Sequence, residues 1–328
     1  MSAPVDLAVI IPAYKARFFR DALECLATQT WQRFRVYVGD DAGEPALREI
    51  CDTYRNRVDL VYHRFEQNLG GVDLVGHWNR CVALSAGEPW LWLFSDDDLC
   101  DPGAVEAFYR TIEAAPGYDV YRWDTTVRDE QGSVLRESPP APSRETGCEF
   151  ALSRLMLERR SFVVDYVFSR RAYDREGGFV SFPHAWFADD ASWLAFSRAT
   201  GICGIPGPRI HWRLSTSNVS GTFRPDLAIG KAHALFQYHA WLQTYVSEAT
   251  HEPRTVREAI GQNQSAWFYH QLGVAGCYRK PSLALALMRP GSEALGVGRW
   301  RFGVALFANI LRYSARRLRR WLQNPLRR

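Results

Sequence analysis

Two acidic clusters at the ends of predicted strands carry residue types that could do chemistry. Gly39-Asp40-Asp41 ends one apolar run, and Ser95-Asp96-Asp97-Asp98 follows another, Trp90 to Phe94. Consecutive carboxylates repel one another, and a divalent cation or solvent can offset that repulsion. The second cluster therefore predicts either a metal site or a solvated acidic turn that caps the next helix.

A third acidic pair, Asp189 and Asp190, lies among aromatic residues. Trp186 and Trp193 flank the pair, and Gly177-Gly178-Phe179 precedes it. A carboxylate beside apolar rings is desolvated, and desolvation raises its pKa and suits it to proton transfer. The alternative is an acid pair that caps an amphipathic helix.

The elements that must position these residues alternate between strands and helices. Short apolar, β-rich runs predict strands at 5–11, 35–38, 60–63, 90–94 and 120–123. Amphipathic spacing predicts helices at 73–86 and 103–115, the second with Asp101 as its N-cap. Such βα units form a mainly parallel sheet that gathers ligands at the carboxyl ends of its strands. Further helical segments are expected at 226–247, 254–272 and 300–322.

Composition and charge exclude several classes of protein. With 328 residues, 47% of them hydrophobic, the chain can bury a large core and is not a disordered tail. Residues 299–328 hold nine arginines and no acid; subtracting these nine from the net charge of +4 leaves −5 on residues 1–298. That distribution disfavours a nucleic-acid partner. Seven single cysteines indicate a reducing compartment, and no secretory signal or membrane-spanning run is expected.

The ordered motifs resemble the inverting family 2 glycosyltransferases of GT-A fold that build bacterial cell-surface polysaccharides. The matching elements are VIIPAYK at 9–15, Gly39-Asp40-Asp41, Asn68-Leu69-Gly70, Asn79, Ala86-Gly87-Glu88, and Ser95-Asp96-Asp97-Asp98 with Pro102. The resemblance covers about residues 5–221. It implies a Rossmann-like, mostly parallel α/β sheet sandwiched by helices and followed by a C-terminal helical region.

The resemblance also implies where the donor and a divalent metal, Mn²⁺ or Mg²⁺, would bind. The implied nucleotide-sugar-binding residues are Pro12, Ala13, Tyr14, Asp41, Asn79, Asp96 and Arg213. Asp41 would contact the uracil and Asp96 the ribose, while the guanidinium fork of Arg213 would match the diphosphate. Tyr14 could equally be a core aromatic residue.

The implied metal ligands are Asp97, Asp98 and His211. Most family members carry Asp at the position of Ser95 and a late His at the position of Ser215, so His211 could take the place of that His. The alternative for both His211 and Arg213 is a solvated edge strand and polar loop.

On the acceptor side, the resemblance assigns Asp190 as the general base that deprotonates the acceptor hydroxyl. Asp189 lies beside it, and the other implied acceptor-side residues are Gly178, Trp186 and Trp193.

The expected organisation is a GT-A catalytic domain over residues 1–221 and a helical region over 222–328. The catalytic domain would comprise a nucleotide-binding half, about 1–123, and an acceptor-side half, about 124–221. The last helix, 300–322, alternates arginines with an apolar row that includes Phe302 and Leu306. Such a helix can lie on the inner membrane surface or pack on the body with its arginines in solvent.

The sequence therefore predicts an inverting, metal-dependent glycosyltransferase. It would move a sugar from a nucleotide-sugar, expected to be UDP-linked, to a hydroxyl of a growing, possibly lipid-linked cell-surface glycan such as O-antigen or capsule. The expected location is cytoplasmic and peripheral on the inner membrane. The alternative is a non-catalytic glycan- or membrane-binding scaffold. A sugar-nucleotide pyrophosphorylase is disfavoured, because residues 12–16 contain no glycine.

Overall fold

The chain folds into two compact units in a computed structural model that describes residues 6–215 and 224–323. The first unit comprises Met1–Ser181 and Ala188–Gly221, and the second comprises Phe182–Phe187 and Thr222–Arg328. One boundary thus lies at residue 221, and the short segment 182–187 belongs to the second unit although its sequence neighbours belong to the first.

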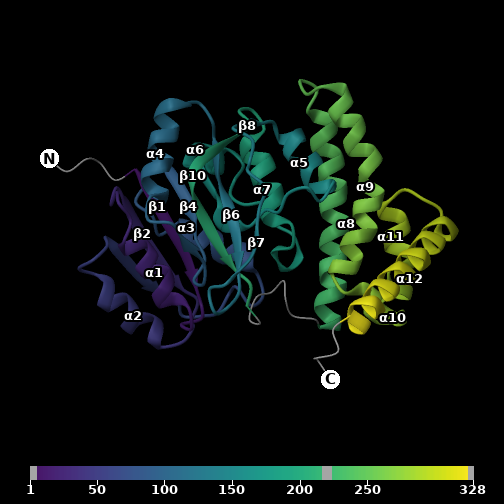
Figure 1. The fold of residues 1–328 in the computed structure, drawn as a ribbon, viewed down its shortest axis with the longest axis horizontal. Helices are drawn as coiled ribbons and strands as arrows, with labels where there is room; N and C mark the ends of the chain where they lie inside the picture. The colour runs from purple at the N-terminus through teal and green to yellow at the C-terminus, as the bar shows by residue number, and fades with distance from the viewer. Residues whose placement is uncertain (1–5, 216–223, 324–328) are drawn as a thin grey trace. The chain divides into compact units, whose positions relative to one another are not determined.

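A sheet with helices on its faces forms the first unit (Figure 1). Its strands are β1 Leu7–Ala13, β2 Phe34–Asp40, β3 Leu60–Arg64, β4 Trp90–Leu93, β5 Leu99–Cys100, β6 Val120–Arg128, β7 Val134–Glu137, β8 Arg144–Glu145, β9 Tyr166–Ser169 and β10 Ile202–Arg213. Its helices are α1 Phe19–Ala27, α2 Ala46–Tyr54, α3 Leu74–Val82, α4 Ala104–Ala114, α5 Gly147–Leu155, α6 Arg170–Arg175 and α7 Ala188–Ser197, with a 3-10 turn, η1, at Val163–Asp165. The strands and helices predicted between residues 5 and 123 are confirmed.

The main path of the sheet runs β3-β2-β1-β4-β9-β6-β10-β5. Strands β3, β2, β1 and β4 are parallel, with Val9 of β1 opposite Val36 of β2 and Trp92 of β4. Strand β10 is parallel to β6, whereas β9 lies antiparallel between β4 and β6. Because β1, β2 and β4 point the same way, the polar residues that follow them meet at one edge of the sheet.

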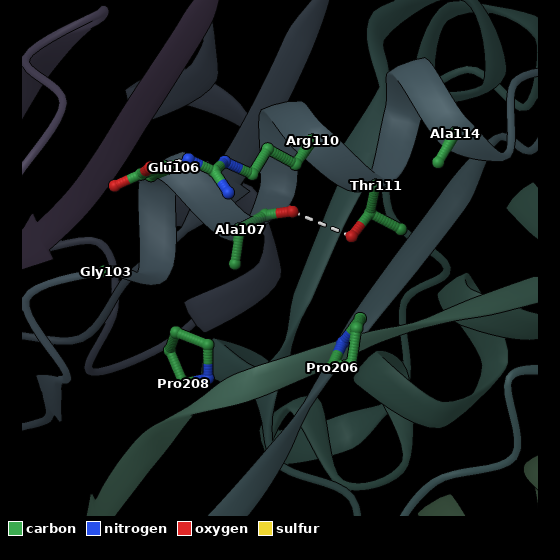
Figure 2. Close-up of a pocket in the computed structure, with 8 residues that line it drawn as sticks. All are labelled: Gly103, Glu106, Ala107, Arg110, Thr111, Ala114, Pro206 and Pro208. Carbon is green, nitrogen blue, oxygen red and sulfur yellow. Dashed lines mark hydrogen bonds and ion pairs between the residues drawn. The ribbon is translucent and has the colours of Figure 1, made fainter.

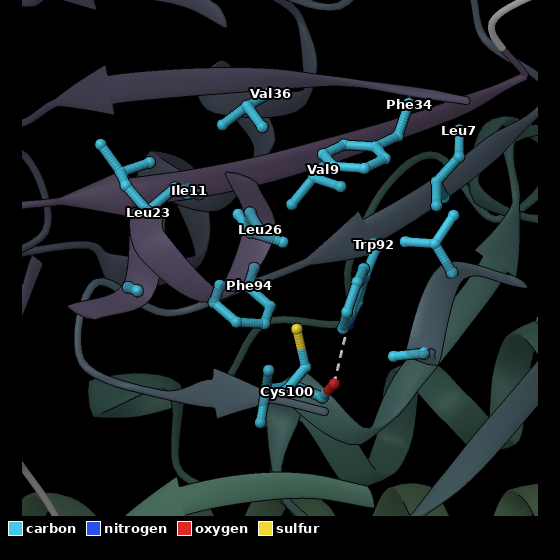
Figure 3. Close-up of a cluster of buried hydrophobic side chains, with 14 of the residues drawn as sticks. Leu7, Val9, Ile11, Leu23, Leu26, Phe34, Val36, Trp92, Phe94 and Cys100 are labelled. Carbon is cyan, nitrogen blue, oxygen red and sulfur yellow. Dashed lines mark hydrogen bonds between the residues drawn. The ribbon is translucent and has the colours of Figure 1, made fainter. Parts of the chain in front are cut away.

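Alternate residues of the central strands build the core (Figure 3). Val9 and Ile11 of β1 are fully buried in the same cluster as Leu26 of α1. The indole of Trp92 donates a hydrogen bond to the carbonyl oxygen of Val164 at 2.8 Å, so this large ring keeps its polar group satisfied in the core. The core thereby fixes β1 and its neighbour β4, which is followed by Asp96, Asp97 and Asp98, the three residues that we call the acidic edge.

Side-chain caps decide where several helices begin. Helix α5 starts with a capping box formed by Thr146 and Glu149. Helix α4 does not use the predicted cap, Asp101, and begins at Ala104 with Gly103 at the N-cap. The Asp101 carboxylate instead accepts the backbone N–H of Arg209 at 2.8 Å. It therefore ties the start of α4 to β10.

Helices form the second unit. They are α8 Pro225–Glu248, α9 Arg254–Val274, α10 Pro281–Ala286, α11 Met288–Ala294 and α12 Arg299–Gln323, with 3-10 turns η2 Pro183–Ala185 and η3 Cys277–Arg279. The three long helices confirm the predicted helical segments, while α10 and α11 were not expected. Over residues 6–215 and 224–323, no helix has the length and apolar character needed to cross a membrane.

Helix α12 buries part of the apolar row for which the sequence predicted either membrane contact or packing on the body. Phe302 and Leu306 are 0% and 3% exposed, and the Phe302 ring lies 5.6 Å from that of Tyr269 in α9. This part of the predicted row therefore packs within the second unit. A different row of large apolar side chains is exposed, namely Trp300, Val304, Phe307 and Leu311.

Candidate active site

Asp96 connects the ends of the two central parallel strands. Its Oδ2 atom accepts the backbone N–H groups of Tyr14 at 2.9 Å and Lys15 at 3.0 Å, just beyond β1. The Tyr14 side chain is 48% exposed and Ala13 is buried, so the aromatic ring lies at the surface beside this junction and is not a core residue. The end of β1, which includes Pro12 and Ala13, and Asp96 thus meet at one junction, and their contact with a nucleotide stays a prediction.

Asp97 and Asp98 differ in how the protein satisfies them. The Asp98 carboxylate is 1% exposed and accepts the backbone N–H of Arg213 at 2.8 Å. Burial, and then the charge of Asp96, raises the pKa of Asp97 to about 7. Burial also raises the pKa of Asp98 well above its usual value, and Asp97 adds to that effect. A cation placed at Asp97 would relieve this repulsion.

Arg213 lies against the protein side of the acidic cluster. Its Nε atom donates to the carbonyl oxygen of Asp97 at 2.8 Å, and its Nη2 atom pairs with Asp21 at 3.1 Å. The guanidinium also lies 4.2 Å from the centre of the Phe18 ring, and the residue is 5% exposed. In this arrangement Arg213 supports the cluster, and its predicted contact with a diphosphate stays a prediction.

His211 lies against Asp101. Its Nε2 atom is 2.9 Å from Asp101 Oδ1, and its buried Nδ1 atom has no hydrogen-bond partner among the described residues. Burial lowers the pKa of His211, although Asp101 opposes that shift, so the neutral imidazole is favoured. The predicted role of His211 as a metal ligand is not tested by this placement.

Asp41 is buried at the end of β2 and holds the Asn68-Leu69-Gly70 loop. Its two carboxylate oxygens accept the backbone N–H groups of Leu69 and Gly70, each at 2.8 Å. Arg80 of α3 forms an ion pair with the same carboxylate. These contacts explain why the loop motif accompanies Asp41, whose contact with uracil stays a prediction.

Asn79 joins α3 to the glycine motif of the acceptor side. Its Oδ1 atom accepts the hydroxyl of Tyr173 at 2.9 Å and the backbone N–H of Phe179 at 3.3 Å. Gly178 has a φ of +108°, and a Cβ atom there would lie 3.0 Å from Asn79 Oδ1. The structure therefore brings Asn79 and Gly178 together, with a requirement for glycine.

The first turn of α7 presents Asp189 and Asp190 in different environments. Asp190 is 2% exposed, and its Oδ2 atom accepts Nε of Arg154 at 3.1 Å and Nη2 at 2.8 Å. Asp189 is half-buried, and burial followed by the charge of Asp190 raises the pKa of Asp189 to about 7. In this pair, the Asp190 carboxylate is held by the Arg154 guanidinium, whereas Asp189 stays protonated over most of the acidic pH range.

The two tryptophans predicted on the acceptor side lie in different units. Trp193 is fully buried in α7 and stacks on Tyr166, with ring centres 4.6 Å apart, so we do not propose that it stacks on a sugar. Trp186 is half-buried in the second unit, where the Lys231 ammonium lies 4.3 Å from its ring centre.

The acidic edge offers donors suited to a hard divalent cation. No group of three or more His, Cys, Asp or Glu side chains within 6–215 and 224–323 is arranged to hold a metal ion by itself. Mg²⁺ commonly uses one or two carboxylates and completes its shell with substrate phosphates and water. The half-buried carboxylate of Asp97, which the charge of Asp96 repels, fits a site of that kind, with Asp98 beside it.

A separate hollow of about 510 Å³ lies between α4 and a bulge of β10 (Figure 2). Glu106 and Arg110 line one side, and Pro206 and Pro208 line the other. None of the predicted site residues lines this hollow, so it is distinct from the acidic edge.

Two arginines that contact predicted site residues were missed by sequence reasoning. Arg154 precedes its partner Asp190 by 36 residues, and Arg80 follows Asp41 by 39 residues. No local spacing connects either pair. The adjacency of Arg80 to the motif residue Asn79 was the one available signal.

Comparison with known proteins places this geometry in a family. Residues 8–177 match glycosyl transferase family 2, and the chain belongs to that family. It is 28% identical over 152 residues to the poly(ribitol-phosphate) beta-N-acetylglucosaminyltransferase TarS of Staphylococcus aureus, covering 45% of this chain and 25% of TarS. It is 22% identical over 108 residues to the glycosyltransferase GlyG of Streptococcus pneumoniae, covering 33% of this chain and 35% of GlyG. The chain thus spans only a quarter to a third of these relatives.

Solved structures confirm the GT-A fold. The crystal structure of S. aureus TarS 1-349 in complex with UDP-GlcNAc aligns with a TM-score of 0.67 at 16% identity, covering 88% of this chain and 81% of that one. The mannosyltransferase PcManGT of Pyrobaculum calidifontis, in complex with GDP-Man and Mn²⁺, aligns with a TM-score of 0.51 at 16% identity, covering 97% and 88%.

Proposed function

We propose that this family 2 glycosyltransferase transfers a sugar from a UDP-linked donor to a hydroxyl of a cell-surface glycan, with inversion at the anomeric carbon. The observation that carries the proposal is the junction at Asp96, which gathers the ends of β1 and β4 beside Asp97. The complex of TarS with UDP-GlcNAc supports a uridine donor. A nucleotide would bind along this edge, with Pro12, Ala13 and Tyr14 on one side and Asp41 on the other.

A divalent metal fits this site, and Asp97 would hold it with support from Asp98. When bound, Mn²⁺ or Mg²⁺ would neutralise the negative charge that grows on the departing diphosphate. The Mn²⁺ bound with GDP-Man to PcManGT supports this part of the proposal. Arg213 would hold the cluster in place from the protein side, through its backbone and side-chain contacts with Asp98 and Asp97.

The acceptor hydroxyl would attack the anomeric carbon directly. As the new glycosidic C–O bond forms, the bond to the UDP oxygen breaks, UDP leaves with the bonding electron pair, and Asp190 takes the hydroxyl proton. A single displacement of this kind inverts the configuration. General base catalysis of this type contributes roughly 10²- to 10⁴-fold in rate. The N–H donors of Arg154 hold the Asp190 carboxylate in place.

We further propose that the enzyme is cytoplasmic and binds the inner membrane surface through α12. The exposed row Trp300, Val304, Phe307 and Leu311 recurs at helical spacing, and α12 contains no acidic residue. Exposed Arg301 and Arg312 each follow a residue of that row by one position, so they lie along one flank of it. Apolar side chains flanked by arginines suit an anionic bilayer surface, where a lipid-linked acceptor would also be found.

Calorimetric titration with UDP tests the donor site. UDP should bind the wild-type protein more weakly after Mn²⁺ and Mg²⁺ are removed, and Asp97→Ala should reproduce that loss. Asp52→Ala is the matched control, because Asp52 pairs with Arg55 on the exposed surface of α2. Equal UDP binding in EDTA would exclude the proposed metal role.

Release of UDP from UDP-GlcNAc, measured with a panel of glycan and poly(ribitol phosphate) acceptors, tests catalysis. Asp190→Asn should bind UDP normally and lose transfer by roughly 10²- to 10⁴-fold. Binding without turnover of UDP-sugars on any acceptor would favour the scaffold alternative.

A further inference from the structure

The two oxygens of the Asp190 carboxylate are treated differently by the protein. Oδ2 accepts two N–H groups of Arg154, at 3.1 and 2.8 Å. Oδ1 is buried and has no hydrogen-bond partner among the described residues. An unpartnered buried carboxylate oxygen is costly, and the protein therefore retains at Asp190 one acceptor that a ligand hydroxyl could satisfy.

Arg154 is itself firmly held. It lies in the last turn of α5, a helix that begins with the capping box of Thr146 and Glu149. Its Nη1 atom donates to the carbonyl oxygen of Arg159 at 2.7 Å, on the opposite side of the guanidinium from Asp190. Burial opposes the charge of Arg154, but Asp190 outweighs it and raises the pKa of the guanidinium. Arg154 therefore stays charged, and its guanidinium, which is held on both sides by hydrogen bonds, has little freedom to rotate.

The ionisable groups of this pair and around it come from three elements. Arg154 lies on α5, Asp189 and Asp190 lie on α7, and the buried hydroxyl of Tyr166 comes from β9. Burial raises the pKa of Tyr166 beyond the physiological range, so its phenol is neutral. Arg154 is thus the cation that both bonds to Asp190 and sets which way its carboxylate faces.

We propose that Arg154 is a positioning residue that selects Asp190 Oδ1 as the proton acceptor for the incoming hydroxyl. This inference rests on the proposed role of Asp190 as the base. By holding Oδ2 with two hydrogen bonds, Arg154 stops the carboxylate from rotating and leaves Oδ1 for the acceptor. Small losses of orientation at a reacting group cost on the order of 10²-fold in rate.

Variants at Arg154 test the proposal through donor binding, turnover and rescue. Arg154→Gln keeps the length and hydrogen-bonding capacity of the side chain but not its charge or its paired donors. It should bind UDP as the wild type does, with kcat for UDP release from UDP-GlcNAc and acceptor reduced roughly 10²-fold. Arg154→Lys, which restores the charge, should recover part of kcat.

Arg159→Gln is the matched control. Arg159 forms a buried ion pair with Glu145 at 2.6 Å, so its loss perturbs the same region without touching the Asp190 carboxylate. It should lower the melting temperature but leave kcat near the wild-type value. If Arg154→Gln and Arg159→Gln lower kcat equally, or if lysine rescues nothing, Arg154 is only structural and the proposal is overturned.

Asp190→Asn and the double variant separate this proposal from the assignment of the base. If Asp190→Asn abolishes transfer and Arg154→Gln adds nothing to it, the two residues act as one unit, as proposed. If Asp190→Asn abolishes transfer while Arg154→Gln transfers sugar at the wild-type rate, only the positioning role is wrong. Near-normal turnover by Asp190→Asn, or no turnover by the wild type with any acceptor, would refute the proposed function and this inference with it.

Discussion

Removing the Asp96 carboxylate should lower the unfolding free energy of the protein, and the size of the loss can be worked out from the hydrogen bonds that Asp96 accepts. Its Oδ2 atom accepts two backbone N–H groups, those of Tyr14 and Lys15. A hydrogen bond to a charged group contributes about 1.5–3 kcal/mol and a neutral one about 0.5–1.5 kcal/mol. Asp96→Asn can keep both bonds in neutral form and should lose about 2 kcal/mol of unfolding free energy. Asp96→Ala leaves both N–H groups unpaired and should lose about 3–5 kcal/mol.

Urea unfolding measured by circular dichroism gives these free energies, and calorimetry gives UDP affinity for the same samples. Because the segment that would flank the nucleoside is held by Asp96, UDP should bind more weakly in the order wild type, Asn, Ala. The exposed acid Asp52 serves as control, since Asp52→Asn removes a surface ion pair of α2 and should cost under about 1 kcal/mol. If Asp96→Ala unfolds at the wild-type urea concentration, Asp96 does not hold the strand ends together.

Three further predictions follow from described contacts. The folded-state pKa of Asp189 is raised to about 7, so the unfolding free energy of the wild type should fall as pH rises from about 4 to 7. Asp189→Asn should lose that pH dependence. If urea unfolding gives the same dependence of unfolding free energy on pH for both proteins, the prediction is wrong. Gly178→Ala forces an alanine into a positive φ, so this variant should lose on the order of 1–3 kcal/mol of unfolding free energy. An unchanged melting temperature would contradict this prediction. Serine at both Phe307 and Leu311 should reduce sedimentation with vesicles of 30% phosphatidylglycerol but leave the melting temperature unchanged. Serine at Leu285, which is also exposed but lies on α10, should change neither sedimentation nor melting temperature. A change in dimerisation instead would mean that a second copy covers α12.

The sequence predicted the parallel part of the sheet because its strands are short runs rich in apolar and β-forming residues, which can be recognised without a distant partner. Strand β9 escaped prediction, because its four residues pair with β4 and β6 across long stretches of chain. Spacing within a segment carries no information about such pairing. The antiparallel strand in an otherwise parallel centre is therefore a finding of the structure alone.

At the site, the junction of Asp96 with the end of β1 follows from strand order, which the motifs imply. The partners of Asp190 and Asp41 do not, because both arginines come from distant elements. The burial of Trp193 could have been predicted from the sequence. Residues 188–197 are apolar around most of the helix, and a helix that is apolar on all sides is buried. Helix α12 has two apolar rows, and periodicity alone cannot say which of them packs.

The place of β9 between β4 and β6 bears on how the protein is made. During synthesis the nucleotide-binding strands β1 to β4 emerge from the ribosome long before Tyr166–Ser169. Until β9 arrives, β4 and β6 each present an unpaired edge, and such edges are where nascent chains mispair and aggregate. A fragment that ends after β6 would keep those open edges permanently. We therefore expect that the nucleotide-binding half does not fold independently, because the sheet is complete only with β9, which precedes Asp190 in the chain.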